Sequence, residues 1–357
     1  MLFFIHIPKT AGSTWRSILY RQYGDGKVCP VYDGDGWYYS VREVRRMAAA
    51  RRNSYEAMLG HIGLERVDLM ANAAHVAIST LLRHPVSRGE SLIRHLQAND
   101  PAYRGKSPHE VLDSGNPQFD NHQVRMLCST PPREGRAGAP ELDSAVRALE
   151  GFAHFGLSER FQETYALACL QLGWRPVAYQ RRNVGVDPGG RDTQASGVRE
   201  RLAELNGIDM QLYEEAKRLF EDRIAYQMRS NAGRWSARLA QVARFEGTPV
   251  ELQAQGGIGQ AGQGILRGWA RLPGFDHPAI VQCLWNGQVM VEAEARDPRP
   301  ALAAKGIEPG GRCGFTLDVA RAMRSRGLPA QGIEVEVTVR QSPRSRLKYR
   351  GSLGIPL

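Results

Sequence analysis

The sequence contains little cysteine and no long apolar run. Only five of its 357 residues are cysteines, and no two of them form a C-x-x-C pair. An odd number at wide spacing does not suit a disulfide scaffold or a zinc knuckle, and it fits a reducing compartment. The apolar run 1–5 breaks at His6, and the stretch 71–82 is too short to span a bilayer. We therefore expect a cytoplasmic protein without membrane insertion.

Charge of one sign is not concentrated in any one part of the chain. The 47 basic and 37 acidic residues leave a formal net charge of +10. Residues 1–244 hold 33 basic against 27 acidic residues, and residues 245–357 hold 14 against 10. A nucleic-acid-binding arm would carry the excess on one segment, so we expect no nucleic-acid polymer as a partner. An anionic substrate is compatible with this charge.

The overall composition is that of a globular chain. Apolar residues make up 42% and charged residues 24% of the sequence, which excludes a mainly disordered, collagen-like or coiled-coil protein. The 38 glycines and 20 prolines indicate many turns. The length indicates two domains, which we place at residues 1–240 and 241–357.

The first predicted domain alternates strands with helices. Continuous apolar runs, which suit buried parallel strands, occupy Leu2–Ile7, Val76–Leu82 and Phe152–Leu157. Apolar residues at helical spacing occupy Ser13–Tyr23, Pro85–Gln97, Val198–Leu205 and Met210–Met228. Ser158 is predicted to cap a further helix. This alternation predicts a three-layer αβα fold around a parallel sheet.

The second predicted domain has the pattern of short strands. Asn286-Gly287 stands between two apolar arms, and both residues tolerate the positive φ of a type I′ hairpin. Further strands are predicted at Ile265–Leu272, Gly314–Val319 and Ile333–Arg340. Loops are predicted at Ser129–Pro140, Asn183–Gly197 and Gln253–Gly264. The spacing of the strands predicts a small all-β, sandwich-like domain.

One segment carries the residues of an anion-binding loop. Between the first strand and the first helix the chain runs Pro8-Lys9-Thr10-Ala11-Gly12-Ser13-Thr14. Backbone N–H groups at a helix N-terminus carry partial positive charge, Lys9 adds a full charge, and Ser13 and Thr14 add hydroxyl donors. Gly12 lets the backbone come close to a ligand. Because the lysine precedes the glycine, the order differs from the Walker A motif that a P-loop kinase requires.

A second segment places an arginine at the end of a predicted strand. Arg83 follows the apolar run, and Ser91 lies eight residues later, two turns along the predicted helix. A guanidinium group offers a planar fork to a phosphate. Each segment alone is a weak signal, but the two occur in a defined order on a strand end, a loop and a helix.

Together these segments resemble the sulfotransferases that use 3′-phosphoadenosine 5′-phosphosulfate (PAPS), especially the carbohydrate sulfotransferases and their bacterial relatives. The resemblance implies a P-loop-type sheet in which the loop 9–14 holds the 5′-phosphosulfate, while Arg83 and Ser91 bind the 3′-phosphate. It implies sulfuryl transfer to an acceptor hydroxyl, expected to belong to a carbohydrate. The product would be 3′-phosphoadenosine 5′-phosphate (PAP), and we expect no metal.

Further segments extend the resemblance over roughly residues 1–230. The stretch 119–127 is similar to a D-N-x-Q-x-R-x-L motif of the bacterial members, which makes Asn121, Gln123 and Arg125 candidates for the acceptor cleft. Their alternative role is in folding. Arg181 and Arg182 begin a glycine-rich stretch, and sulfotransferases often close a basic loop over the nucleotide. The alternative for this pair is a solvated surface loop.

An acceptor alcohol needs a general base, and His61 is the first candidate because imidazole suits a base near neutral pH. The run Leu59-Gly60-His61 resembles the carbohydrate sulfotransferase pattern. Lys9 would stabilise charge that develops on the transferring group. Glu65 is the second candidate base, since many related enzymes use a carboxylate. His6 is interpreted as a packed residue that shapes the loop.

The C-terminal residues resemble a module of some bacterial polysaccharide-modifying enzymes, through Arg267-Gly268-Trp269-Ala270 and the run 296–300. Two functions other than sulfuryl transfer are left open. The first is a non-catalytic protein that binds nucleotide or glycan on the same scaffold. The second, with less support, is a P-loop kinase, which would need the Walker A motif that this sequence lacks.

Overall fold

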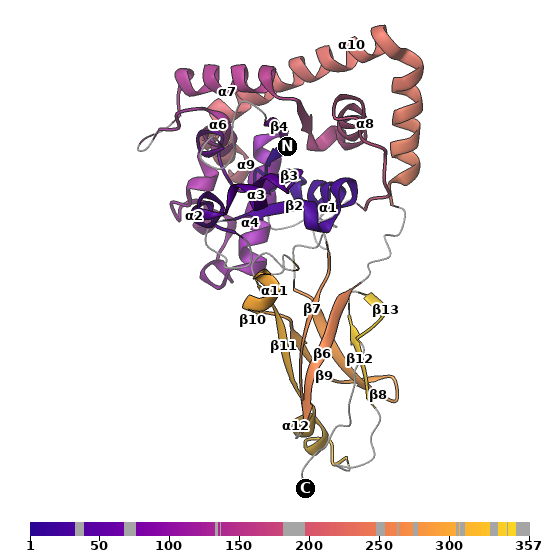
Figure 1. Ribbon diagram of the computed structural model, residues 1–357. Coiled ribbons are helices and arrows are strands. Elements are labelled where there is room, and N and C mark those ends of the chain that lie inside the picture. Colours follow the sequence, from indigo (N-terminus) through magenta and orange to yellow (C-terminus); the bar gives the residue numbers. More distant parts are fainter. Residues whose placement is uncertain are drawn as a thin grey trace. The chain divides into compact units, whose positions relative to one another are not determined.

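The computed structural model divides the chain into two compact units (Figure 1). The first comprises Met1–Tyr23, Lys27–Tyr32 and Val41–Pro249, and the second is formed mainly by Val250–Leu357. Residue 240 lies within helix α10, and the assignment of an accessory domain from residue 241 onward stays a prediction. The structure describes residues 1–32, 39–67, 76–132, 135, 137–180, 197–247, 254–262, 264–273, 278–304, 307, 311–328, 335–340 and 342–347.

A parallel five-stranded sheet forms the centre of the first unit, with strand order β2-β3-β1-β4-β5. The strands are β1 (Leu2–Ile5), β2 (Val28–Val31), β3 (Ala57–Gly60), β4 (Ala77–Leu82) and β5 (His154–Leu157). Strand β1 is in the middle and is buried along its whole length. A central strand of a parallel sheet is covered on both faces, which explains why the residues of β1 form a continuous apolar run. The predicted parallel sheet is thereby confirmed.

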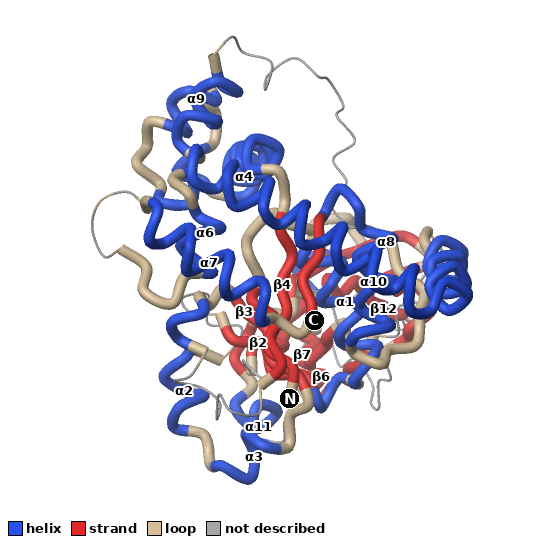
Figure 2. Tube along the Cα trace, turned by 90° about the horizontal axis from the view of Figure 1, so that it is seen from above, coloured by secondary structure: helices blue, strands red, loops and turns tan. Residues whose placement is uncertain are grey.

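Helices cover both faces of this sheet. Helices α1 and α8 lie on one side of the strands, and α4, α6 and α9 lie on the other (Figures 1 and 2). The longer helices are α1 (Gly12–Tyr23), α4 (Pro85–Asn99), α7 (Ala139–Gly151), α8 (Phe161–Gln171), α9 (Val198–Leu205) and α10 (Gly207–Phe245). The shorter ones are α2 (Val41–Arg46), α3 (Ala49–Asn53), α5 (Pro108–Leu112) and α6 (His122–Leu127). The three-layer prediction is therefore confirmed.

Two local predictions in this unit need correction. Ser158 does not cap a helix: its hydroxyl donates to the Leu82 carbonyl oxygen at 3.0 Å, and this bond joins the ends of β5 and β4. Helix α8 begins only at Phe161, after a single 3-10 turn. The helix predicted to end at Met228 continues as α10, with non-helical dihedral angles at Asn231. Among the described residues, no helix combines the length and apolar character needed to cross a membrane.

The second unit holds two antiparallel four-stranded sheets, with strand orders β10-β11-β7-β6 and β13-β12-β8-β9. The strands are β6 (Gln255–Gly262), β7 (Ile265–Arg271), β8 (Ile280–Trp285), β9 (Gln288–Glu294), β10 (Asp297–Pro298), β11 (Arg312–Asp318), β12 (Glu336–Val339) and β13 (Ser342–Arg346). Two short helices accompany them, α11 (Pro300–Ala304) and α12 (Val319–Arg324). Buried residues from both sheets, among them Leu266, Phe315, Val281 and Val337, form one apolar cluster.

Of two predictions for the second unit, the hairpin at Asn286-Gly287 is confirmed and the glycine-rich loop before β7 is wrong. Asn286 and Gly287 have φ values of 49° and 75°, which confirms the predicted hairpin between β8 and β9. The stretch predicted as a loop is instead β6, which pairs with β7. At Gly256 a Cβ atom would lie 2.4 Å from the Trp269 carbonyl oxygen. This glycine permits close strand packing, so the glycine content was wrongly interpreted as a loop signal.

The packing of Gly60 at the end of β3 leads to a stability prediction. A Cβ atom at Gly60 would lie 1.7 Å from the backbone oxygen of Val31 on β2, and a strand backbone cannot rotate away as a side chain can. We expect Gly60→Ala to lower the free energy of unfolding by about 3 kcal/mol, measured by chemical denaturation. Gly207→Ala is the control, because nothing lies within 4 Å of its Cβ position at the start of α10. Equal unfolding free energies for the two variants would contradict the close approach.

Candidate active site

The parallel sheet brings three predicted site residues to one edge. Ile5 of β1 pairs with Gly60 of β3 and with Thr80 of β4, so these strands end at similar levels. His61 follows β3, the Lys9 loop follows β1, and Arg83 follows β4. Ligands of open α/β sheets bind outside the carboxyl ends of the strands. The edge formed by β3, β1 and β4 is therefore the candidate active site.

The loop between β1 and α1 has an unusual backbone. Lys9 and Ala11 adopt φ values of 70° and 69°, in the left-handed region that residues other than glycine seldom occupy. Left-handed residues in a turn can direct successive N–H groups toward a common point, which is the geometry of an anion-binding nest. The fully buried Thr10 stabilises this turn, since its hydroxyl donates to the Ile7 carbonyl oxygen at 2.9 Å. The hydroxyl of Thr10 thus serves the loop itself.

Gly12 is required by its neighbour His6. A Cβ atom at Gly12 would lie 1.9 Å from both Cδ2 and Nε2 of the His6 ring. That ring is buried and held by a 2.7 Å hydrogen bond between its Nδ1 and the hydroxyl of Tyr32. Burial, followed by the charges of His61, Arg16 and Lys9, lowers the pKa of His6 well below its ordinary value. His6 is therefore a neutral packing residue that shapes the loop.

Positive charges gather around Lys9. The guanidinium of Arg83 donates to the Lys9 carbonyl oxygen, with 3.2 Å between Nη1 and O. Burial, then the charges of Arg83 and Arg94, lower the pKa of Lys9 to about 8. Sequence reasoning missed Arg94, although it lies on α4 three residues after Ser91, on the same helix face. An anion between these cations would relieve their mutual repulsion.

The other residues assigned to the cofactor are placed as follows. Ser13 and Thr14 lie in the first turn of α1, where Thr14 is buried and Ser13 is partly exposed. Ser91 is partly exposed on α4. Arg181 and Arg182 lie outside the described residues. The individual roles of all these residues stay predictions.

Of the residues predicted to line the acceptor cleft, two are buried and bonded within the protein. The Oδ1 atom of Asn121 accepts from the backbone N–H groups of Ile208 and Asp209, each at 2.9 Å. The side-chain amide of Gln123 is bonded to the backbone of Arg83. Asn121 is 4% exposed and Gln123 is 0% exposed.

Arg125, the third of these residues, is partly exposed but also bonded within the protein. Its guanidinium donates to the Asp120 carboxylate at 2.7 Å and to the Gly135 carbonyl oxygen at 2.6 Å. All three side chains thus hold neighbouring segments together, as the alternative role in folding requires. Their role in binding an acceptor stays a prediction.

His61 and Glu65 are in different environments. The His61 side chain is exposed, with its ring centroid 4.6 Å from that of His6 and 4.7 Å from that of Tyr32. The Glu65 carboxylate folds over Gly63, where a Cβ atom would lie 2.1 Å from Oε2. Burial raises the pKa of the Glu65 carboxyl group. His61 is thus the more accessible of the two candidates and lies directly beside the Lys9 loop.

Sequence reasoning also missed His122, the first residue of α6. Burial, then the charges of Arg88, His61 and Arg125, lower its pKa well below the ordinary histidine value. The charge of His61 thus acts on His122 although the two residues are 61 positions apart in the sequence. The only sequence signal was the position of His122 inside the family-like stretch 119–127.

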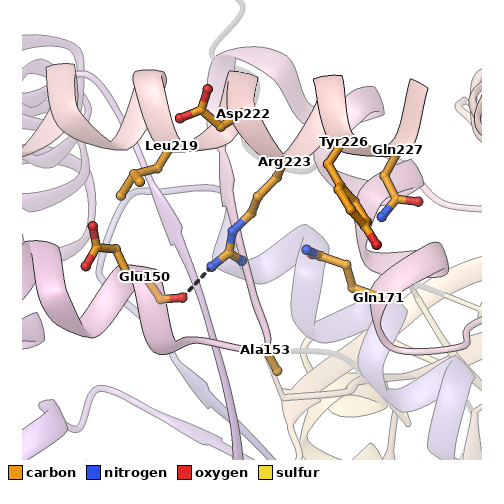
Figure 3. A pocket seen from close by; sticks show the side chains of 8 residues that line it. All are labelled: Glu150, Ala153, Gln171, Leu219, Asp222, Arg223, Tyr226 and Gln227. Carbon is orange, nitrogen blue, oxygen red and sulfur yellow. Dashed lines mark hydrogen bonds between the residues drawn. The ribbon is translucent and has the colours of Figure 1, made fainter. Parts of the chain in front are cut away.

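A groove of about 540 Å³ lies elsewhere, among α7, α8 and α10 (Figure 3). Ala153, which lines it, precedes β5, so the groove is at the amino-terminal edge of the sheet. Arg223 in the groove donates to the carbonyl oxygens of Leu149 and Glu150 at 2.8 and 3.1 Å, and its guanidinium lies 4.5 Å from the Phe155 ring centroid. Arg223 thereby caps the carboxyl end of α7. The groove contains none of the predicted site residues.

Within the part of the chain that the structure describes, no three His, Cys, Asp or Glu side chains are grouped as a metal site would need. The expectation of metal-free chemistry stays a prediction.

No family model matches the chain. Human heparan-sulfate 6-O-sulfotransferase 1 is 31% identical over 183 residues, which cover 42% of this chain and 44% of that protein. Mouse heparan-sulfate 6-O-sulfotransferase 3 is 25% identical over 281 residues, covering 62% of this chain and 58% of that protein. The chain thus spans about half the length of the curated relatives it matches.

The fold defines an α/β protein with positive charges gathered at the carboxyl edge of its parallel sheet. The curated relatives are sulfotransferases, and the chain is similar to them over part of its length, in agreement with the resemblance at Lys9 and Arg83. A crystal structure of mouse sulfotransferase SULT7A1 complexed with PAP has a TM-score of 0.31 and 11% identity, covering 67% of this chain and 87% of that chain. From a likeness at this level we draw nothing.

The lowered pKa of Lys9 predicts how anion binding depends on pH. With a pKa of about 8, the side chain is charged at pH 7 and loses its proton as the pH rises. An anion binds the protonated form better, so we expect the affinity for PAP to fall about tenfold between pH 7 and pH 9.5. Isothermal titration calorimetry measures this change.

Lys9→Arg is the matched control, because a guanidinium stays charged over this range. Its affinity should change little with pH. An equal pH dependence in the wild type and in Lys9→Arg would assign the titration to another group.

Proposed function

We propose that the chain transfers the sulfuryl group of PAPS to a hydroxyl group of a carbohydrate. The observation that carries the proposal is the cationic edge, where a left-handed backbone at Lys9 and Ala11 adjoins the Arg83 guanidinium. The similarity to heparan-sulfate 6-O-sulfotransferases supports both the reaction and a glycan acceptor. PAPS supplies an activated sulfuryl group whose transfer leaves PAP.

The residues of this edge fit the two ends of such a nucleotide. The nest before α1 offers backbone donors to the 5′-phosphosulfate, and Lys9 places positive charge where the leaving phosphate gains negative charge. Arg83 and Ser91, with Arg94 as an addition, would hold the 3′-phosphate. The fit rests on the left-handed backbone at Lys9 and Ala11 and on the Arg83 guanidinium held beside it, and an anion bound there would offset the repulsion between the cations.

His61 is the proposed general base. It follows β3, directly beside the strand that leads into the Lys9 loop, and its exposed ring is accessible to an acceptor hydroxyl. Contacts with His6 and Tyr32 restrict the orientation of that ring. In this arrangement His61 accepts the hydroxyl proton while Lys9 stabilises the opposite side of the transferring group.

Finer assignments belong to the same proposal. Two sheets around one apolar cluster support a β-sandwich accessory module, and the resemblance of residues 267–270 and 296–300 supports the bacterial type. A cytoplasmic location is supported by the five cysteines, which are buried and form no disulfide bond in the structure. Burial raises the pKa of Cys29 and Cys169 to about 12, so these thiols stay protonated. Chemistry without a metal is proposed because the cations of the edge supply the charge that the leaving group needs.

The nucleotide site is tested by thermal unfolding with added ligand. A ligand that binds only the folded state raises the melting temperature by mass action. We expect PAP to raise it more than ATP, AMP or GDP, and the shift to be lost in Arg83→Ala. A larger shift with ATP and Mg²⁺ would instead favour a kinase.

The base is tested by turnover. His61→Ala should lower kcat, measured from the PAP that turnover produces, by about 10²- to 10⁴-fold. PAP should still bind, since only the proton acceptor is removed. His109→Ala removes an exposed histidine on α5 and serves as the control. If His61→Ala keeps its turnover and Glu65→Gln loses it, the carboxylate is the base.

A further inference from the structure

The side chain of Gln123 is bonded on both sides to the backbone of Arg83. The Arg83 N–H group donates to Oε1 of Gln123 at 3.0 Å, and Nε2 of Gln123 donates to the Arg83 carbonyl oxygen at 2.8 Å. The pairing of β4 with β5 ends one residue earlier, at Leu82 and Leu157. The amide group of Gln123 therefore takes the place of a neighbouring strand at the residue where the ladder has ended.

Gln123 is itself held at the junction of α6 and α10. Its backbone N–H donates to Oδ2 of Asp209 at 3.0 Å, and the N–H of Val124 donates to Oδ1 of the same carboxylate at 2.8 Å. Asp209 lies in the first turn of α10 and is 0% exposed. Asn121, before α6, in turn accepts from two backbone N–H groups of α10.

The two helices thus cap each other's N-termini. A continuous chain of hydrogen bonds runs from Asp209 through Gln123 and the Arg83 backbone, and the Arg83 guanidinium extends it to the Lys9 carbonyl oxygen.

We propose that Gln123 is a positioning residue, which holds the backbone of Arg83 so that its guanidinium faces the nucleotide. This inference rests on the proposed function, in which Arg83 binds the 3′-phosphate. It differs from the sequence-based expectation that Gln123 touches the acceptor. With 0% of its surface exposed, the side chain has no face on which to bind an acceptor.

The chemistry of the side chain explains why a glutamine stands here. The two bonds to the Arg83 backbone need one acceptor and one donor in a single plane. The side chain must also be long enough to reach that backbone, which the three side-chain carbons of glutamine allow. A glutamate would keep the acceptor for the Arg83 N–H, lose the donor, and place a second carboxyl group near Asp209. A methionine of similar size would lose both bonds to the Arg83 backbone.

The test separates nucleotide binding from acceptor binding. We expect Gln123→Met to raise the Kd for PAP and the KM for PAPS about tenfold, with kcat and the acceptor KM unchanged, because only binding through Arg83 is weakened. Gln123→Glu should have a smaller effect, and it carries the test if Gln123→Met does not fold. In an Arg83→Ala background, Gln123→Met should have no further effect on PAP affinity.

Asn206→Ala is the matched control. Asn206 is buried at the same junction, donates to the carbonyl oxygens of Phe119 and Leu202, and has no hydrogen bond to Arg83. An equal loss of PAP affinity in this control, or a raised acceptor KM in Gln123→Met with an unchanged PAPS KM, would overturn the positioning role. So would unaltered PAP binding by Gln123→Met when the wild type binds PAP. If the wild type itself does not bind PAP, the proposed function fails first.

Discussion

The hydrogen bond from the Arg83 guanidinium to the Lys9 carbonyl oxygen joins the two elements that we propose bind the nucleotide. It spans 74 positions in the sequence and 3.2 Å in space. Because the acceptor is a neutral carbonyl group, this bond orients the guanidinium without cancelling its charge. Burial is the largest cause of the lowered pKa of Lys9, and the electrostatic cost of keeping the two cations close together adds to it. A bound phosphate or sulfate would turn that cost into attraction.

Such an arrangement needs a rigid support, and buried polar side chains supply it. Asn121, Gln123 and Asp209 bind backbone groups at the starts of α6 and α10 and at the end of β4. A buried polar group without a hydrogen bond lowers the stability of the folded protein. The donor and the acceptor of each buried bond therefore restrict one another to one geometry. Their place beside Arg83 means that the packing of two distant helices determines where the arginine points.

Glycine has two different structural roles in the second unit. Gly287 adopts a positive φ in a hairpin turn, as the Asn-Gly pair predicts. Gly256 lies in a strand, where the carbonyl oxygen of Trp269 leaves no room for a side chain. Local sequence favours a loop in both places, and only the partner strand distinguishes them.

The sequence by itself determined three strands of the parallel sheet, the Lys9 loop and the order of the site elements. The apolar runs predicted at Leu2–Ile7, Val76–Leu82 and Phe152–Leu157 contain β1, β4 and β5, because continuous apolar character is typical of buried parallel strands. Lys9, Gly12 and Arg83 were recognisable because their chemistry is local to a strand end and the turn that follows it.

Only the tertiary structure shows the surroundings of Gln123, Arg94 and His122. Each is influenced by a residue far away in sequence: the backbone of Arg83, the charge of Lys9 and the charge of His61. A hydrogen bond or a Coulomb interaction acts over a few ångströms of space, and sequence spacing does not specify such distances between separate elements. The interior position of Gln123 likewise follows from the packing of α6 against α10, which no local pattern encodes.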